Sequence, residues 1–234
     1  MEAIETKTGV DWQNSLFIGT AHTLAAVAIV YLIAADFSWW TIALALLWFG
    51  LCGFSITAGY HRLLAHRAYE AHPIVRALFL FFGAAAIQNS ALNWCSDHRR
   101  HHARTDTRDD PYNIRQGFWW AHIGWVMSTS GKKPAARMPD LRADRLVQFQ
   151  HDHYLALAIF AGAILPFSLG MLWGDPWGSQ LVVGFLRLVF QWHVTFCVNS
   201  VAHMFGSQPY GDKTSARDSF WVALITLGEG YHNY

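Results

Sequence analysis

Three long stretches without a charged residue restrict the fold of this sequence more than any other feature. They cover residues 16–35, 37–60 and 154–174. A helix of about 20 apolar residues spans the ~30 Å hydrocarbon core of a bilayer, so each stretch is long enough to be a transmembrane helix. A fourth stretch, residues 178–202, is equally long but contains Arg187. We expect that face to point into the protein, because a lipid-facing arginine is costly.

The composition agrees with a membrane protein, since 53% of the residues are apolar and only 14% are charged. Three further uncharged stretches, residues 77–93, 116–131 and 219–228, are too short to span and fit interfacial, re-entrant or buried helices. The sequence therefore predicts an all-α integral membrane protein whose four transmembrane helices form two hairpins.

The distribution of positive charge predicts the orientation in the membrane. Of the 17 Lys and Arg residues, 13 fall between Arg62 and Arg145, and the turns around Asp36 and residues 174–179 have none. The positive-inside rule then places residues 61–153 in the cytoplasm, and with four spans both termini as well. The polar opening segment does not resemble a signal peptide. A formal net charge of +1 indicates no nucleic-acid partner.

The cysteines and glycines indicate none of the common redox or nucleotide sites. Cys52, Cys95 and Cys197 follow no paired spacing, so we expect neither a disulfide framework nor a cysteine zinc site. No glycine-rich phosphate loop and no flavin, haem or ferredoxin-like motif is recognisable. Redox chemistry, if present, must reside in a metal or a partner protein.

Histidines carry the most specific signal. Seven of the thirteen lie where an apolar segment gives way to polar sequence, namely His61, His66, His98, His101, His102, His203 and His232. Helix positions i, i+3 and i+4 share a face, so we expect His98, His101 and His102 to point at one centre while Arg99 and Arg100 point away.

The pair in "HRLLAH" has a five-residue offset, which on a regular helix turns the two rings apart. We expect His66 to ligate from just past the helix end, or to bind a second metal. The remaining histidines are read as structural, with His122 and His193 the least settled, and they are His22, His72, His122, His151, His153 and His193. A basic cluster such as residues 97–102 can also bind anionic lipid.

Six motifs in order resemble the membrane fatty acid desaturases, and among them the acyl-CoA Δ9 (stearoyl-CoA-like) branch. They read "GYHRLLAH", "DHRRHH", "DDPYN", "GFWWAHIGW", "VNSVAHMFG" and "GEGYHNY". The resemblance implies one desaturase domain over residues 1–234, with four transmembrane helices under a cytoplasmic helical cap of residues 61–153 and 203–234. It also implies a di-metal site of two iron ions, which uses O2 and two electrons to remove two hydrogens from an acyl chain.

The resemblance assigns the iron ligands by position. These are His61, His66, His98, His101, His102, His203 and His232, with Asn199 reaching one metal through water. Imidazole nitrogens suit iron, whereas zinc has no redox chemistry and could occupy the site without turnover.

The same resemblance implies a bent tunnel for the acyl chain. Its kink would be formed by Gln88, Trp94 and Thr195, and its blind end by Phe49 and Gly53. These five residues have a second interpretation, because aromatic and small side chains also simply pack membrane helices.

The carrier of the acyl chain is less specified. Acyl-CoA enzymes usually show an Arg-Asp pair before the second histidine box, and this chain has Ser96 and Asp97. Asn89, Lys132, Lys133 and nearby arginines can still meet a phosphate-bearing carrier, and Asp97 is expected among the substrate-binding residues. Coenzyme A is the expected carrier, and an acyl-lipid substrate stays open.

Other readings stay open as well. A membrane hydroxylase or alkane monooxygenase would share the histidine boxes, and a metal-storing or lipid-binding protein would need no turnover. Since the chain shows no electron carrier of its own, we expect an external donor such as cytochrome b5 or ferredoxin at the cytoplasmic basic region.

The third histidine box of the family continues with two more histidines after "HNY", where this sequence stops at Tyr234. The sequence is then either truncated inside that box or that of an inactive relative; we expect truncation, and an inactive 234-residue form.

Overall fold

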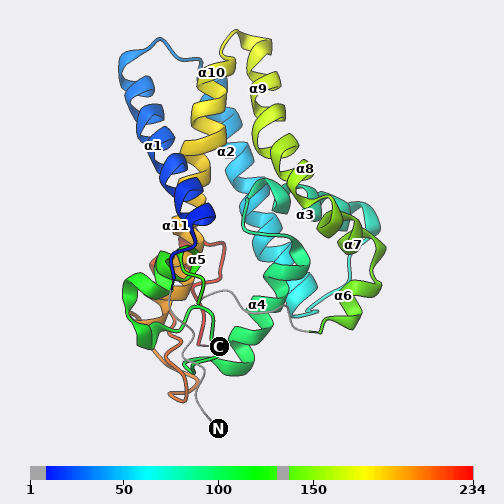
Figure 1. Cartoon of the computed structure of the whole chain (residues 1–234), viewed down its shortest axis with the longest axis vertical. Coiled ribbons are helices and arrows are strands. Elements are labelled where there is room, and N and C mark those ends of the chain that lie inside the picture. The colour runs from blue at the N-terminus through cyan, green and yellow to red at the C-terminus, as the bar shows by residue number, and fades with distance from the viewer. Residues whose placement is uncertain (1–8, 131–136, 234) are drawn as a thin grey trace. The chain divides into compact units, whose positions relative to one another are not determined.

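The computed structural model describes residues 9–130 and 137–233. In these residues the regular structure is helical and no strand occurs, so the predicted all-α class is confirmed. The described chain divides into two compact units. One comprises residues 20–99 with the described part of 136–194, and the other comprises the described parts of 1–19, 100–135 and 195–234 (Figure 1). A single domain over residues 1–234 stays a prediction.

Several α-helices continue directly into π-helical or 3₁₀-helical segments, so that one long helix can comprise several labelled elements. In chain order they are α1 (Trp12–Ala34), α2 (Trp39–Phe54), η1 (Ser55–Ala65), α3 (Pro73–Ala85), α4 (Ala91–Arg104), η2 (Ile114–Gln116), η3 (Trp120–Gly124), α5 (Trp125–Met127), α6 (Pro139–Ala143), α7 (Arg145–Asp152), α8 (Tyr154–Ile159), η4 (Phe160–Ile164), α9 (Leu165–Gly170), η5 (Met171–Trp173), α10 (Pro176–Ser179), η6 (Gln180–Leu186), α11 (Arg187–Ser200), η7 (Val201–His203) and α12 (Phe220–Ile225).

The four predicted spans are confirmed as helices long and apolar enough to cross a membrane. They are Trp12–Ala34, Trp39–Ala65, Tyr154–Trp173 and Pro176–His203. The second helix continues beyond the predicted end at residue 60, because the first histidine motif extends it. In the most apolar window of the first helix only 22% of the residues are buried, which suits a surface that faces lipid rather than water.

A carboxylate ties three of the rods together within the unit of residues 20–99 and 136–194. Asp175 caps the N-terminus of α10 by accepting from the Gly178 backbone N–H at 3.0 Å. The same carboxylate accepts from Tyr31 Oη of α1 at 2.7 Å and from Thr41 Oγ1 of α2 at 2.6 Å. Polar groups among apolar helices need such partners, so this cluster fixes the helix ends at the two tight turns.

Two glycines let α3 lie close against η1. A Cβ added at Gly59 would come within 2.7 Å of Phe79 Cβ, and one added at Gly83 would overlap the Tyr60 ring. Tyr60 is fully buried there and its hydroxyl accepts from Gln150 Nε2 at 2.7 Å. This packing sets the position of η1, which carries the first histidine motif.

In the second unit, Asp218 brings two distant loops together. It forms antiparallel bridges to Ser207, which follows His203, and to Tyr231, which precedes His232. Its carboxylate also accepts from the Asn233 backbone N–H at 2.9 Å. These bonds place the third histidine motif beside the "VNSVAH" segment, although the two are separated along the chain.

Candidate metal centre

A π-helix explains the five-residue offset of the first histidine motif. The motif lies on η1, and the backbone N–H of His66 donates to the His61 carbonyl at 2.9 Å. This i to i+5 bond stacks the two positions one turn apart, where an ordinary α-helix would separate them. The ring centroids of His61 and His66 are 4.4 Å apart. His66 follows directly after the helix end, as the sequence predicted.

Arg99 anchors the second motif to the first. Its guanidinium donates to the Leu64 carbonyl at 2.8 Å and to the Ala65 carbonyl at 2.9 Å, which belong to buried residues in the last turn of η1, where carbonyls lack partners within the helix. The same group pairs with Asp140 at 2.8 Å, and Arg67 pairs with that carboxylate at 2.6 Å. Arg99 therefore points away from the histidines, as predicted, and locks α4 against η1.

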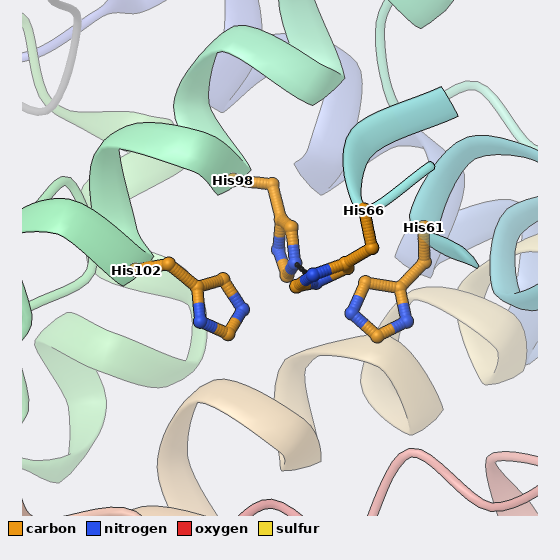
Figure 2. Close-up of side chains that lie close together, drawn as sticks. All are labelled: His61, His66, His98 and His102. Carbon is orange, nitrogen blue, oxygen red and sulfur yellow. Dashed lines mark hydrogen bonds between the residues drawn. The ribbon is translucent and has the colours of Figure 1, made fainter. Parts of the chain in front are cut away.

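The first histidine group comprises His61, His66, His98 and His102, each of which offers one ligand nitrogen within 4.8 Å of the others. Figure 2 shows the four imidazoles turned toward a common point. The Nε2 atoms of His66 and His98 are only 2.9 Å apart. Two ring nitrogens can approach this closely when one donates a proton to the other, or when both lone pairs face one cation.

The second group consists of His101, His203 and His232, again within 4.8 Å. The expectation that His98, His101 and His102 converge on one centre is thus replaced by a division between two groups. At about 100° per residue, His98 and His102 differ by about 40° around α4, whereas His101 and His102 differ by about 100°. One helix therefore supplies both groups.

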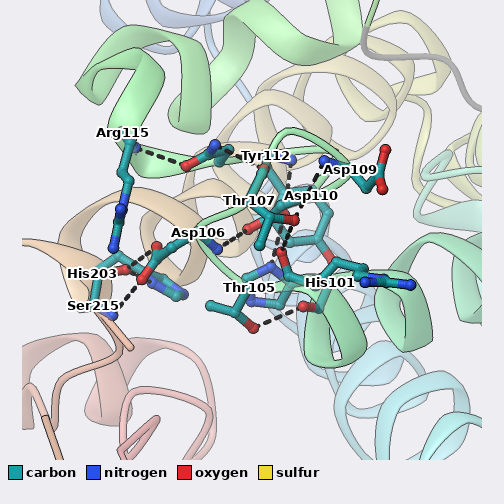
Figure 3. A network of polar contacts seen from close by, with 12 residues as sticks. His101, Thr105, Asp106, Thr107, Asp109, Asp110, Tyr112, Arg115, His203 and Ser215 are labelled. Atoms are coloured by element: carbon teal, nitrogen blue, oxygen red, sulfur yellow. Dashed lines mark hydrogen bonds and ion pairs between the residues drawn. The ribbon is translucent and has the colours of Figure 1, made fainter. Parts of the chain in front are cut away.

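Buried acceptors fix the rings of the second group. Nδ1 of His101 lies 2.9 Å from Asp110 Oδ1, and both side chains are buried. Nδ1 of His203 lies 2.7 Å from Ser215 Oγ, and that hydroxyl donates to Asp106 Oδ1 at 2.5 Å (Figure 3). Because carboxylates accept only, Nδ1 carries the proton of this bond in both histidines, and in a neutral ring Nε2 is then the atom with the free lone pair. Such carboxylate–histidine pairs orient metal ligands.

The donor set fits a first-row transition metal. All seven predicted histidine ligands lie in the two groups, and imidazole is a good ligand for iron, copper, nickel and zinc. Nε2 of His203 is buried and has no hydrogen-bond partner among the described residues. A buried acceptor without a donor is costly, and a metal ion at that atom would remove the cost. The two histidine groups are therefore candidate sites for metal ions.

Six of the seven predicted substrate residues, all but Thr195, lie in the unit of residues 20–99 and 136–194, which also contains His61, His66 and His98. The Trp94 ring stacks on His98 with centroids 4.9 Å apart and 20° between the planes. Its Nε1 donates to Gln88 Oε1 at 3.4 Å. Asn89 is exposed and accepts from the Ser90 backbone N–H at 2.9 Å.

The other predicted site residues are placed as follows. Asp97 is half-buried on α4, and Asn199 and Thr195 are half-buried on α11. Phe49 and Gly53 lie one turn apart on α2 and are half-buried. The Phe49 ring packs on Phe190 at 5.4 Å, which also fits simple helix packing. Lys132 and Lys133 lie outside the described residues.

Sequence reasoning missed the residues that hold the ligands. Asp110 was noticed only within "DDPYN", and Asp106, Ser215 and Asp140 not at all. Histidines read as structural also meet polar partners: Nδ1 of His122 lies 2.9 Å from Ser200 Oγ, and Nε2 of His22 lies 3.0 Å from Nε2 of His193. No local pattern marks these contacts, because each joins segments far apart in the sequence.

Comparison with known proteins identifies the family of the chain. The model of the family described as "Fatty acid desaturase" matches residues 37–234. The chain belongs to this family. It is 45% identical over 228 residues to a probable acyl-CoA desaturase of Schizosaccharomyces pombe, covering 96% of this chain and 47% of that protein. It is 40% identical over 190 residues to acyl-CoA desaturase 1 of Saccharomyces cerevisiae, covering 80% and 37%.

A third relative in the family has a different printed substrate. The sn-1 stearoyl-lipid 9-desaturase of Anabaena variabilis is 33% identical over 234 residues, covering 99% of this chain and 83% of that protein. The chain spans about half of the Schizosaccharomyces pombe relative and less of the Saccharomyces cerevisiae one. With four apolar helices and this family, the protein is a membrane protein.

Asp110 should control metal affinity without touching the metal. We expect Asp110→Asn to weaken Co²⁺ binding by the full-length protein about 10- to 100-fold, because the amide no longer enforces the His101 tautomer. Titration of the detergent-solubilised protein measures this. The matched control is Asp109→Asn, since Asp109 is adjacent and exposed. Equal affinity of the two variants would contradict the role given to Asp110.

Asp140 should make stability depend on pH. Hydrogen bonds from Arg99, followed by those from Arg67, hold the pKa of Asp140 well below its usual range. A carboxylate with a lowered folded-state pKa stabilises above its unfolded pKa of about 3.9, and this contribution is lost as pH falls below that value. Thermal unfolding should therefore show Asp140→Asn less stable than wild type at pH 7, with the difference shrinking below about pH 4.

The control for this experiment is Asp152→Asn, whose carboxylate, among the described residues, accepts an exposed hydrogen bond from Gln148 Nε2. This variant should have nearly the unfolding temperature of the wild type both at pH 7 and below about pH 4. A difference between Asp140→Asn and wild type that stays constant down to pH 3 would contradict the assignment.

Proposed function

We propose that the protein desaturates a long-chain fatty acyl substrate with O2 at a centre of two iron ions. The observation that carries the proposal is the pair of histidine groups that share helix α4, in a chain of the fatty acid desaturase family. Each group would hold one ion. The reaction converts one –CH2–CH2– unit, O2, two electrons and two protons into –CH=CH– and two molecules of water.

Histidine ligands suit this chemistry. An unactivated methylene has no acidic proton, so general base catalysis cannot begin the reaction. Two irons held by neutral imidazoles would supply, with O2 and two electrons, an oxidant able to remove hydrogen from such a carbon. Zinc would fit the ligands but has no redox chemistry.

The chain itself would contribute by holding the imidazoles of its ligands in one tautomer. Asp110 and the Ser215–Asp106 pair keep the protons of His101 and His203 on Nδ1. Arg99 holds α4 against the end of η1, so His98 and His102 stay opposite His61 and His66. These contacts pre-organise the nitrogens, which lowers the reorganisation needed on metal binding.

A fatty acyl chain on coenzyme A, desaturated at the Δ9 position, is the substrate we propose. The acyl-CoA desaturases of the two yeasts support the carrier by analogy, and the stearoyl-lipid relative supports the position. Because Ser96 precedes Asp97 where acyl-CoA enzymes usually have Arg, an acyl-lipid substrate is the alternative. Asn89 and Asp97 are the proposed residues near the carrier.

The acyl chain itself would bend beside the metal ligands. Stacking of Trp94 on His98 supports a chain passing this ring on its way to the metal, with Gln88 and Thr195 lining the same bend. Phe49 and Gly53 would close the far end of the tunnel. Asn199 would reach one iron through water.

Electrons must come from another protein, for which cytochrome b5 or a ferredoxin is proposed. The basic segment between Arg62 and Arg145 offers a docking face for an acidic carrier, and it would lie on the cytoplasmic side with the metal centre and both termini.

Loss of one ligand should abolish the reaction. We expect a host that expresses the full-length gene to accumulate new monounsaturated fatty acids, and His98→Ala, His101→Ala or His102→Ala to reduce them to background. Gas chromatography of total fatty acids measures this. The control is His153→Ala, because His153 is exposed and lies outside both groups.

Other products would point elsewhere. Hydroxylated fatty acids in place of monoenes would indicate a hydroxylase. No new product, with iron bound, would favour a protein that stores metal or binds lipid. Wild-type yield in one variant would remove that residue from the ligand set.

Enlarging Gly53 should shorten the preferred acyl chain. A bulky side chain overpacks a closed apolar tunnel at a typical cost of ~1 to 3 kcal/mol, so Gly53→Leu is expected to shift product toward shorter monoenes. The matched control is Gly50→Leu on the same helix, because nothing lies within 4 Å of a Cβ added there. An identical chain-length profile in both variants would contradict a tunnel end at Gly53.

A further inference from the structure

The turn between α3 and α4 has an unusual backbone. Ile87 and Asn89 have φ of 50° and 87°, in the left-handed region that favours glycine. For a β-branched residue such as isoleucine this conformation is a genuine outlier. It persists only where surrounding contacts over-determine it.

Helix α11 supplies part of that restraint at the buried end of α3. Ala85 and Ala86 are fully buried, and the last carbonyls of a helix have no partner within the helix. Arg187 Nη1 donates to the Ala85 carbonyl at 3.3 Å, and Trp192 Nε1 donates to the Ala86 carbonyl at 3.0 Å. We call these two bonds the α11 clasp.

The clasp also explains how a buried arginine is tolerated. Arg187 is 4% exposed and, in the described chain, is not paired with a carboxylate. The negative end of the α3 dipole lies at the carbonyl it binds, which favours a cation there. Its Nε donates to the Val183 carbonyl at 2.9 Å and its Nη1 also to Gln191 Oε1 at 3.1 Å, whereas Nη2 is buried without a hydrogen-bond partner in the described chain.

On its other side the turn leads directly to the metal ligands. It opens α4, and the Trp94 backbone N–H donates to the Ser90 carbonyl at 2.9 Å in the first turn of that helix. Gln88 in the turn accepts from the Trp94 indole, and that indole stacks on His98. A shift of the turn would therefore move Trp94 and His98 together.

We propose that Arg187 and Trp192 are positioning residues for the metal site: the α11 clasp fixes the turn of residues 86–90, and through it the orientation of Trp94 and His98 at the start of the ligand helix. This deepens the proposed function, because it rests on a metal bound by the first histidine group. Neither residue touches the metal.

The test compares two tryptophans that make the same kind of bond. Trp192→Phe removes the bond to Ala86, and Trp48→Phe removes an equally buried 3.0 Å bond from Trp48 Nε1 to the Ala161 carbonyl, whose acceptor is not one of residues 86–90. Both should lower the unfolding temperature of the full-length protein in detergent by about 2–4 °C, as expected for one buried hydrogen bond in a chain of this size.

Only the Trp192 variant should alter the metal site. We expect Trp192→Phe to shift the visible absorption bands of the Co²⁺-loaded protein and to weaken Co²⁺ affinity about tenfold, the lower end of effects seen for residues behind metal ligands. Arg187→Lys, which keeps the charge but not the planar fork, should act in the same direction. Trp48→Phe should keep the wild-type spectrum and affinity.

The outcomes separate the inference from the function on which it rests. Wild-type spectra and affinity in Trp192→Phe and Arg187→Lys, with stability lost as in Trp48→Phe, would overturn the positioning role alone. A wild-type protein that binds no Co²⁺ would overturn both. A protein whose spectrum responds to Trp192→Phe but which forms no unsaturated product would overturn the desaturase function and uphold the clasp.

Discussion

The guanidinium of Arg99 is the contact on which the first histidine group depends. Arg99 lies on α4 and donates to the Leu64 and Ala65 carbonyls at the end of η1. Asp140 accepts from the same guanidinium and holds it in place. An α-helix end in an apolar setting needs such donors in any case. Arg99 lies between His98 and His101 in the second histidine motif. One residue therefore both satisfies the backbone carbonyls at the end of η1 and aligns the imidazoles of α4.

Hydrogen-bond acceptors behind the rings fix the orientation of His101 and His203 in the second group. Asp110 and the Asp106–Ser215 pair are buried or nearly so, and each faces the ring nitrogen opposite to the one available for metal. Asp218 brings the loops of His203 and His232 together through backbone bonds. The ligands are thus placed by groups that never touch the metal, which keeps the coordinating nitrogens available.

Much of this could be predicted from the sequence, and the remainder depends on tertiary contacts. Uncharged length predicts the four spans, and the histidine motifs predict the seven histidines that the structure gathers into two groups. His101 separates from His98 and His102 because successive residues of an α-helix are about 100° apart around its axis. The rule that positions i, i+3 and i+4 share one face is too coarse to predict this separation. The partners of Arg99 and His203 lie about 35 and 12 residues away. Such pairs leave no local pattern in a single chain.

The π-helical geometry of η1 makes the first motif sensitive to length rather than to side-chain chemistry. Each residue removed from an α-helix rotates everything after it by about 100°, and a π-helix is in effect an α-helix that has accepted extra residues. A one-residue deletion between Ser55 and His61 could be absorbed by relaxing η1 toward an ordinary helix. A one-residue deletion between His61 and His66 would leave a spacing of four, which keeps both rings on one face only if η1 relaxes fully to an ordinary α-helix.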